Sequence, residues 1–374
     1  MLGDVGAYCI RPKTKIYKLM GVCNTPLQIK KMMNNEQKHN QPHAPKSPCG
    51  GFRGLDYLKL IRVPNLLFLA LTQFLMWQVA TLPLLQLFHF SGISFSYITA
   101  LLMLASIFIT AGGYVINDYF DTKIDVVNRP EKVIVGKIID KEKVMRFYQI
   151  LTALGIVCGL ILSYMARNTT LALIFLVVPG MLWFYSSSYK RMFMIGNLVV
   201  AFCAMLSVLI VAIIQVAIVQ AHIATFDSSW YAHFSIAPQV FRQIYTWIGG
   251  FALFAFVLTW IREIIKDMED ERGDREVECR TMPIKWGITN TKIFLLVLTS
   301  LTIVVLFIAG NFIIPFDGML SVWYINIAVI APLVVLEYLI FKAKTPADFR
   351  QASTLSKIIM LMGVLYSLVF WYLM

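Results

Sequence analysis

The sequence predicts an all-α protein that crosses a membrane nine times. The first observation is composition, because 58% of the residues are hydrophobic, only 14% are charged and the mean hydropathy is +0.70, which excludes an ordinary soluble globular protein. The second is a series of apolar runs long enough to cross about 30 Å of hydrocarbon. The third is that these runs lack the period-two alternation of barrel strands, so they are predicted to be helices.

The predicted spans follow one another along a single domain, residues 56–374. They are expected at 63–85, 96–116, 146–165, 169–186, 196–219, 244–264, 291–313, 320–341 and 355–373. Residues 1–55 are polar, basic and rich in Pro, Gly and Asn, and we expect them to form a disordered tail. The tail has no apolar core followed by a small-residue cleavage site, so it is not a secretory signal. An organelle presequence and a translation start nearer to "GLDYLKLIRVPNLL" are the two alternatives.

The distribution of basic residues predicts the orientation. Of the 33 Lys and Arg, the predicted topology places only Arg167 and Arg242 on the side opposite the N-terminus. The positive-inside rule then puts the N-terminus in the cytoplasm. We expect an integral protein of a bacterial inner membrane whose active site faces the cytoplasm. The net charge of +12 indicates contact with anionic membrane lipids and no nucleic-acid partner, because basic patches interleaved with aromatic residues are missing.

Acidic residues gather in two segments on the predicted cytoplasmic side. Fourteen of the 21 Asp and Glu lie there, namely Asp118, Asp121, Asp125, Glu131, Asp140 and Glu142 after the second span, and Glu263, Asp267, Glu269, Asp270, Glu271, Asp274, Glu276 and Glu278 after the sixth. Random placement in loops would not concentrate them in this way. The two segments therefore predict a functional site.

Within both segments, three aspartates recur at offsets of three and four residues. They are Asp118, Asp121 and Asp125 in "NDYFDTKID", and Asp267, Asp270 and Asp274 in "DMEDERGD". On a helix these offsets bring the carboxylates to one face, where they repel by a few tenths of a kcal/mol per pair. Carboxylates without His or Cys fit Mg²⁺, which commonly shares its coordination with substrate phosphates. Two such faces on one membrane side predict a magnesium-bound diphosphate.

Basic residues close to the acidic segments are candidate phosphate ligands. They are Arg129, Lys132, Lys190, Arg191, Arg262, Lys266, Arg272 and Lys285. The arginine fork matches phosphate oxygens in a bidentate manner, whereas lysine acts as a point charge. The alternative for each of them is a helix anchor at the membrane surface.

Two long stretches resemble the signatures of the UbiA-type intramembrane prenyltransferase family. "YVINDYFDTKIDVVNRPEKVIVGK" is similar to the first signature, an NDxxDxxxD motif followed by Arg-Pro. "REIIKDMEDERGDREVECRTMPIKWG" is similar to the second, with the Thr-x-Pro-x-Lys-x-Gly ending. "LKLIRVPNLL", "YSSSYKRM", "GNLVVA" and "LSKIIMLMG" also look like family sequence. The resemblance covers about residues 56–374.

The resemblance implies a helical bundle around a central cavity that opens to the cytoplasm and binds a prenyl diphosphate through Mg²⁺. The implied ligands of metal and diphosphate are Asn117, Asp121 and Asp125, with Asp118 beside them, and Asp267, Asp270 and Asp274 opposite. The implied substrate-binding residues are Arg129, Lys132, Lys190, Arg191, Arg262, Lys266, Lys285, Asn65 and Tyr185. Tyr114, Tyr119, Tyr185 and Tyr189 are expected either to stabilise a cationic intermediate or to act as interfacial anchors.

The acceptor is predicted less directly than the donor. The two signatures look most like the branch of geranylgeranylglycerol-phosphate geranylgeranyltransferases, which implies transfer to a hydroxyl of a glycerol-phosphate lipid. "RPEKVIVGK" departs from that branch because it lacks the second Arg and the two prolines that follow. An aromatic acceptor of quinone biosynthesis is the alternative. The prenyl length is left open, since Gly112 and Gly113 either shape a tail pocket or allow close helix packing.

Other classes of protein fit the sequence less well. A secondary transporter would place acids near the membrane midplane in broken helices, whereas these acids lie at helix ends. A soluble prenyl synthase is excluded by nine spans of lipid-crossing length. The His and Cys residues lack metal-ligand spacing. Glu337 lies within the eighth predicted span, and it is expected either to face the cavity or to lie near Lys342.

Overall fold

The computed structural model describes residues 53–87, 97–128, 131, 133–223, 231–314 and 319–374, all within one compact unit, Phe52–Met374. Residues 1–52 of the predicted tail lie outside the described residues, and the first helix begins at Arg53. In the described part, the regular elements are helices, accompanied by one isolated bridge between Val135 and Ile139. Nine of these helical stretches are long and apolar enough to cross a membrane. The predicted all-α membrane fold is confirmed.

The helices follow the predicted spans closely. Their bounds are α2 Arg53–Leu60, α3 Val63–Leu75, the π-helix η1 Met76–Thr81, α4 Leu82–Leu87, α5 Tyr97–Phe120, α6 Thr122–Asn128, α7 Lys141–Met165, α8 Thr169–Ser187, the 3₁₀-helix η3 Tyr189–Arg191, α9 Ile195–Ile223, α10 Tyr231–Glu276, α11 Met282–Ile308, the π-helix η5 Ala309–Ile313, α12 Met319–Tyr324, the π-helix η6 Ile325–Ile330, α13 Ala331–Lys342 and α14 Pro346–Leu373.

The largest difference from the prediction is the length of α10. The sequence predicted a span at 244–264, but the helix runs for 46 residues and continues through the second acidic segment. Glu, Arg, Lys and Met are good helix formers, so a charged sequence continues the helix beyond the apolar stretch. The second set of aspartates therefore sits on a helical extension of a membrane span.

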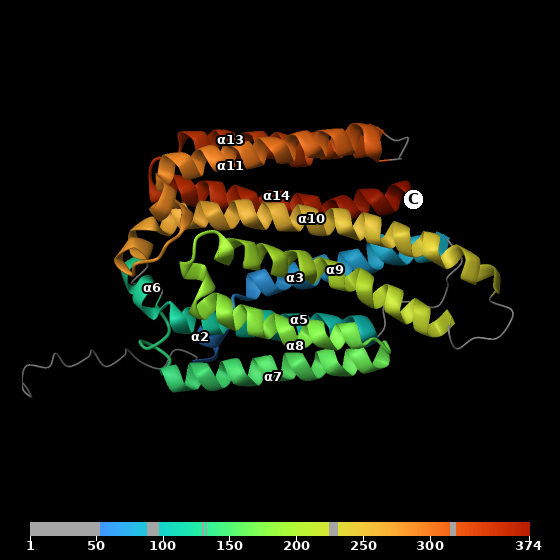
Figure 1. Cartoon of the computed structure of the whole chain (residues 1–374), viewed down its shortest axis with the longest axis horizontal. Helices are drawn as coiled ribbons and strands as arrows, with labels where there is room; N and C mark the ends of the chain where they lie inside the picture. The colour runs from blue at the N-terminus through green and yellow to red at the C-terminus, as the bar shows by residue number, and fades with distance from the viewer. Residues whose placement is uncertain (1–52, 88–96, 129–130, 132, 224–230, 315–318) are drawn as a thin grey trace, which may run out of the picture. The chain divides into compact units, whose positions relative to one another are not determined.

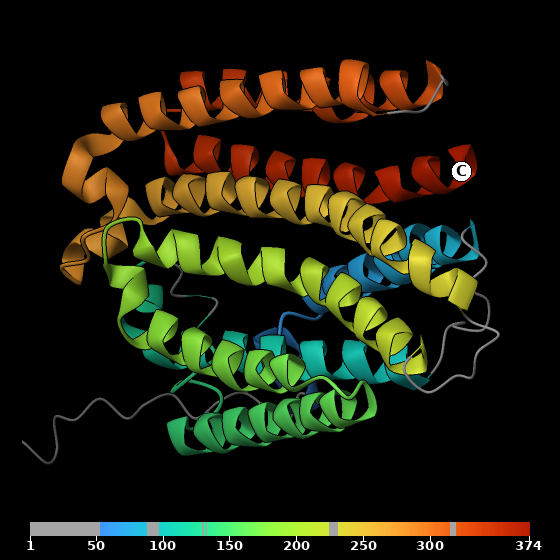
Figure 2. The ribbon, with the colours of Figure 1, turned by 45° about the vertical axis from the view of Figure 1, so that its right-hand side comes forward.

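Two groups of helices flank a central pair. In the first group, α5 packs against α7 and α8. In the second group, α10 and α13 each pack against both α11 and α14. Helices α3 and α9 contact both groups, since α3 touches α5 and α14 while α9 touches α8 and α10. Figure 1 and Figure 2 show this arrangement, with the α5–α6 junction, the α8–α9 turn and the C-terminal end of α10 at the left-hand end of the bundle.

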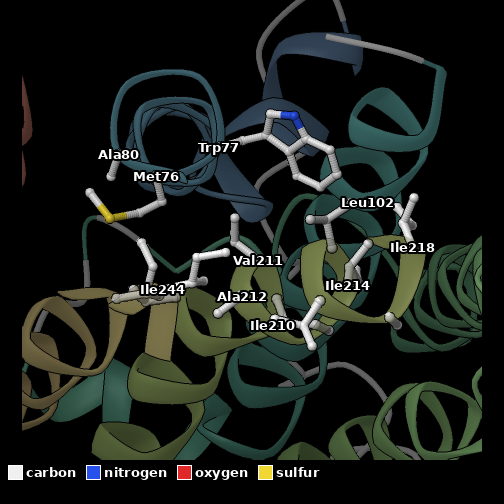
Figure 3. Packing of buried hydrophobic residues seen from close by; sticks show 14 of the residues in the cluster. Met76, Trp77, Ala80, Leu102, Ile210, Val211, Ala212, Ile214, Ile218 and Ile244 are labelled. Atoms are coloured by element: carbon white, nitrogen blue, oxygen red, sulfur yellow. The ribbon is translucent and has the colours of Figure 1, made fainter. Parts of the chain in front are cut away.

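The opposite end of the bundle is filled by the largest hydrophobic cluster. Figure 3 shows Met76 and Trp77 of η1 packed near Leu102 of α5 and Val211 of α9, and Ile244 of α10 belongs to the same cluster. Their side chains are completely buried. Since lipid tails are as apolar as these side chains, close packing rather than exclusion of water holds helices together here. The cluster closes the bundle at the end away from the acidic segments.

Small residues bring α5 and α7 close together. A Cβ on Gly155 would lie 2.6 Å from Ile109 Cγ1, 3.0 Å from the Ile109 backbone nitrogen and 3.2 Å from the Ala105 carbonyl oxygen. A Cβ on Gly112 would lie 2.6 Å from Thr152 Oγ1 of α7, whereas Gly113 faces Leu182 of α8. Gly112 therefore serves helix packing, and Gly113 lines a cavity described below.

The α5–α7 contact predicts a stability effect. Gly155→Val should lower the melting temperature of the detergent-solubilised protein by about 5 °C, because an overpacked contact costs about 1–3 kcal/mol. Gly180→Ala is the control, since a Cβ there meets nothing within 4 Å and Ala favours a helix over Gly. Thermal unfolding of both variants tests the contact, and an unchanged melting temperature for Gly155→Val would contradict it.

Candidate active site

The first acidic segment lies at the junction of α5 and α6. The Asp121 N–H donates to the Asn117 carbonyl at 2.9 Å, and the Asp125 N–H donates to the Asp121 carbonyl at 2.9 Å. The chain thus continues as a helix across the junction, so Asn117, Asp121 and Asp125 share one face. The Asn117 side-chain amide also donates to Asp121 Oδ2 at 2.8 Å. The predicted common face of these residues is therefore present.

Two cations from distant parts of the chain hold two carboxylates of this segment. Lys190 of η3 donates from Nζ to Asp121 Oδ1 at 2.5 Å, with the two side chains only 11% and 15% exposed. Burial lowers the pKa of Lys190 from its usual value, and the nearby Asp121 carboxylate opposes that effect. Arg62 donates from Nη2 to Asp118 Oδ1 at 2.5 Å. Each pair joins segments more than fifty residues apart in sequence.

The third carboxylate, Asp125, lies in surroundings that disfavour its charged form. Burial, followed by the charges of Asp121 and Asp118, raises the pKa of Asp125 to about 6. Arg62 and the more distant Lys266 only partly offset these effects. An additional cation bound here would favour the charged form of Asp125.

Arg62 occupies a left-handed backbone conformation just before α3. Its φ and ψ are both 55°, a conformation that costs about 1 kcal/mol for a residue with a side chain. Leu60 and Leu66 on either side of it are buried in one cluster with Val115 of α5. The guanidinium also lies 4.9 Å from the centre of the Tyr114 ring. Packing of its neighbours thus fixes Arg62 beside α5 despite the strained backbone.

The second acidic segment faces the first. Asp267 of α10 accepts a hydrogen bond from the Asn197 amide of α9 at 2.8 Å, and α6 packs directly against α10. Asp121 is close enough to Asp274 for the two carboxylates to repel each other. Lys266 of α10 is close enough to Asp125 for their opposite charges to attract. The two segments therefore approach one another at the same end of the bundle, as the sequence predicted.

A cavity of about 570 Å³ extends from this end into the bundle, between α3, α5, α8, α9, α10 and α14. Its polar lining consists mainly of Arg62, Asn65, Tyr114, Asn117, Tyr185, Arg262, Glu263, Lys266 and Lys357. Its apolar lining includes Phe68, Ile109, Phe175, Leu182, Phe254 and Val364. A cavity with charged groups in one part and hydrocarbon in the rest fits an amphiphile with a polyanionic head and an apolar tail.

The structure gathers some predicted substrate-binding residues and not others. Asn65, Tyr185, Arg262 and Lys266 line the cavity, and Lys190 pairs with Asp121. The predicted Arg129 and Lys132 lie outside the described residues.

Two predicted cations have other surroundings. The side chain of Arg191 is exposed, and its carbonyl accepts a hydrogen bond from the Arg280 N–H at 2.8 Å. Lys285 is exposed, with Nζ 5.0 Å from the centre of the Phe193 ring. Neither side chain lines the cavity. A contact of these two residues with substrate stays a prediction of the sequence.

Glu337 does not line the cavity either. It lies on α13 and accepts a hydrogen bond from the Ser300 hydroxyl of α11. Lys342 Nζ lies over the Tyr338 ring, 5.9 Å from its centre. Glu337 therefore joins two neighbouring helices.

Sequence reasoning missed three side chains of this region: Arg62, Asn197 and Lys357. Each stands in a stretch that resembles the family, namely "LKLIRVPNLL", "GNLVVA" and "LSKIIMLMG". Their spacing carries no chemical pattern, because tertiary packing brings each of them to the site. The resemblance of these short stretches was the available signal.

The carboxylates fit Mg²⁺ bound together with a diphosphate. In the part of the chain that the structure describes, no three His, Cys, Asp or Glu side chains converge into a complete metal site. Mg²⁺ usually takes one or two carboxylates and fills its remaining positions with water and substrate phosphate oxygens. Facing carboxylates with excess negative charge, together with the Asn117 amide, supply such a partial set of oxygen donors.

The pair between Arg62 and Asp118 predicts energetic coupling. Arg62→Met and Asp118→Asn should each destabilise the protein, and the double variant should lose less than the sum of the two effects, with a coupling of about 1 kcal/mol. Denaturant unfolding in detergent of the two single variants and the double variant measures that coupling. Strict additivity would contradict the contact.

The family model described as UbiA prenyltransferase family matches residues 79–363 of the chain. The digeranylgeranylglyceryl phosphate synthase of Sulfurisphaera tokodaii is 27% identical over 284 residues, which cover 76% of this chain and 87% of that protein. The protein of the same name from Saccharolobus solfataricus is 29% identical over 262 residues, 69% of this chain and 79% of its own.

Solved structures show the same fold. A UbiA homolog from Aeropyrum pernix K1 has a TM-score of 0.58 at 12% identity and aligns over 83% of this chain and 98% of its own. A structure described as digeranylgeranylglyceryl phosphate synthase in membranes has a TM-score of 0.54 at 22% identity and aligns over 85% of this chain and 99% of its own. The family match spans well over half of the sequence, and the chain therefore belongs to the UbiA prenyltransferase family and is a membrane prenyltransferase.

Proposed function

We propose that the protein transfers a prenyl group, geranylgeranyl in the first instance, from its diphosphate to a hydroxyl of a glycerol-phosphate lipid, with Mg²⁺ at the two acidic segments. The observation that carries this proposal is the approach of the two segments next to the polar end of a largely apolar cavity. Asn117 and Glu263 of these segments line the cavity, whereas the six aspartates lie outside its lining. The diphosphate would lie at the aspartates, and its hydrocarbon tail would occupy the apolar part.

In the proposed reaction, the bond between C1 of the donor and its diphosphate oxygen breaks, and the electron pair leaves with the diphosphate. The acceptor hydroxyl oxygen forms the new bond to C1, and its proton passes to the released diphosphate. When bound, Mg²⁺ supplies positive charge that stabilises the leaving group. Asn117, Asp121 and Asp125 would hold the metal on one side, and Asp267, Asp270 and Asp274 on the other.

Other side chains support the same step. Lys190 and Lys266 would add positive charge next to the diphosphate. Lys190 forms an ion pair with Asp121, and the charge of Lys266 attracts the Asp125 carboxylate. The Tyr185 ring lines the cavity and would stabilise positive charge that develops at C1. The apolar side chains of the cavity would exclude water, which would otherwise compete with the acceptor.

The choice of acceptor rests on the relatives. Several relatives carry the name digeranylgeranylglyceryl phosphate synthase, and we infer a glycerol-phosphate lipid acceptor from that name and from the amphiphilic lining of the cavity. The distribution of basic residues supports an active site on the cytoplasmic side, by the positive-inside rule. These relatives are archaeal, and a bacterial inner membrane stays a prediction of the sequence.

Transfer of radiolabelled geranylgeranyl diphosphate by the purified protein in detergent tests the acceptor. Geranylgeranylglyceryl phosphate, 4-hydroxybenzoate and dihydroxynaphthoate should be offered side by side, with and without Mg²⁺. We expect product on the glycerol acceptor alone and only with Mg²⁺. Product on an aromatic acceptor would contradict the proposal and would move the protein to quinone biosynthesis.

The aspartates can be tested in the same assay. Asp121→Ala and Asp267→Ala should each lower turnover by about 100-fold or more, because each removes a ligand of the leaving-group site. Glu142→Ala is the control, since Glu142 lies on α7 with its side chain 86% exposed. Size-exclusion profiles should stay unchanged in all three variants. Wild-type activity in either aspartate variant would contradict the assignment.

A further inference from the structure

The polar end of the cavity carries more positive than negative side chains. Four cations line it, Arg62, Arg262, Lys266 and Lys357, whereas Glu263 is the one carboxylate among the lining residues that the structure describes. Arg62 pairs with Asp118. Arg262 donates to Glu263 Oε1 at 2.6 Å. The other two cations lie near Glu263 without neutralising partners of their own in the cavity lining.

Lys357, like Lys266, is a lining cation without a direct partner in the described part of the chain. It makes no hydrogen bond and no ion pair with the described part of the chain. On α14 it precedes Met360 and Val364 by three and seven residues, and all three line the cavity, so the lysine belongs to the helix face that looks into it. Its ammonium group is therefore available to a ligand in the cavity.

Lys357 and Lys190 serve different parts of the site. The charges that act most strongly on Lys357 are those of Arg262, Lys266, Arg62 and Glu263. None of them is an aspartate of the two acidic segments. By contrast, Lys190 donates directly to Asp121. Lys357 thus belongs to the α10–α14 side of the cavity.

Arg262 supplies a second unused donor on this side. Its Nη1 is engaged by Glu263, while its Nε is buried without a hydrogen-bond partner in the described part of the chain. Because Nε has almost no accessible surface, an anionic oxygen in the cavity would meet the guanidinium at Nη2, which makes no hydrogen bond with the described part of the chain.

The α10–α14 contact fixes these groups relative to each other. A Cβ on Gly363 would lie 2.0 Å from Cε1 of the Phe254 ring, so only glycine lets the two helices approach at this point. Phe254 and Val364 then form apolar lining next to the charged groups. Lys357 and Arg262 are held on neighbouring helices that pack tightly.

We propose that Lys357 and Arg262 form a second anion site, which binds the phosphate of the acceptor lipid while the donor diphosphate lies at the acidic segments. This inference rests on the proposed function. Two polyanionic head groups in one cavity repel each other, so each needs cations of its own. Glu263 acts as a positioning residue because it holds Arg262. An acceptor without phosphate would gain nothing from Lys357.

Steady-state kinetics of Lys357→Met test the site. We expect the KM for geranylgeranylglyceryl phosphate to rise about 10- to 100-fold, the loss expected for one charge-assisted hydrogen bond. The KM for geranylgeranyl diphosphate should stay unchanged. Geranylgeranylglycerol, which lacks the phosphate, should be used equally poorly by wild type and variant. Lys357→Arg should keep the acceptor KM within about threefold of wild type, because the charge is retained.

Lys143→Met is the matched control, since Lys143 lies on α7, 57% exposed, and pairs with Asp140. A wild-type protein that does not prenylate the glycerol acceptor would overturn the proposed function itself. If the wild type is active on the glycerol acceptor, two results for Lys357→Met would overturn this inference alone. One is an unchanged KM for the acceptor, and the other is a raised KM for the donor instead. If Lys357→Met does not fold, an unaltered acceptor KM in Arg262→Lys, which loses the Nη2 donor, would overturn it.

Discussion

The structure depends on the need to offset the negative charge of six aspartates gathered at one end of an apolar bundle. Carboxylates close together repel one another, and a low-dielectric surrounding strengthens that repulsion. The protein offsets part of it with Arg62 and Lys190, which reach Asp118 and Asp121 from distant parts of the chain. Burial, followed by the charges of Asp121 and Asp118, still raises the pKa of Asp125 to about 6. The residual charge is what would attract a divalent cation with its diphosphate.

The rest of the fold positions this charge. The glycine contacts of α7 with α5 set the path of the helix that carries the first acidic segment, and the unusually long α10 carries the second. Helices α3 and α9 link the two groups of helices. The hydrophobic cluster around Trp77 fills the other end, so the cavity joins charged groups at one end of the bundle to a packed apolar interior. The proposed positions of the donor and acceptor head groups therefore lie at the same end.

Much of this architecture was predictable from the sequence because it depends on local patterns. Hydropathy located the spans, and the spacing of the aspartates located two acidic segments that lie at the same end of the bundle. Hydropathy ended the sixth span at residue 264, since it does not register a charged helix that continues beyond the membrane core. The partners of the aspartates were not predictable in this way.

Arg62 and Asn197 illustrate why. Each reaches an aspartate 56 or 70 residues away in sequence, and such contacts are created by tertiary packing. Lys357 likewise stands among apolar residues of the last helix, and only the cavity reveals the direction of its side chain. Lys285, in contrast, follows a recognisable signature and yet lies over Phe193 instead of lining the cavity. Sequence patterns thus identified the chemistry of the site, and packing determined which cations surround it.

The most direct test of the central claim is equilibrium binding of geranylgeranyl thiolodiphosphate, an unreactive donor analogue, to the purified protein by calorimetry. If the two acidic segments hold one metal-bound diphosphate, binding of the analogue should require Mg²⁺. Its affinity should fall by about 100-fold in both Asp121→Asn and Asp267→Asn. Tight binding without Mg²⁺, or binding that either substitution leaves unchanged, would contradict it.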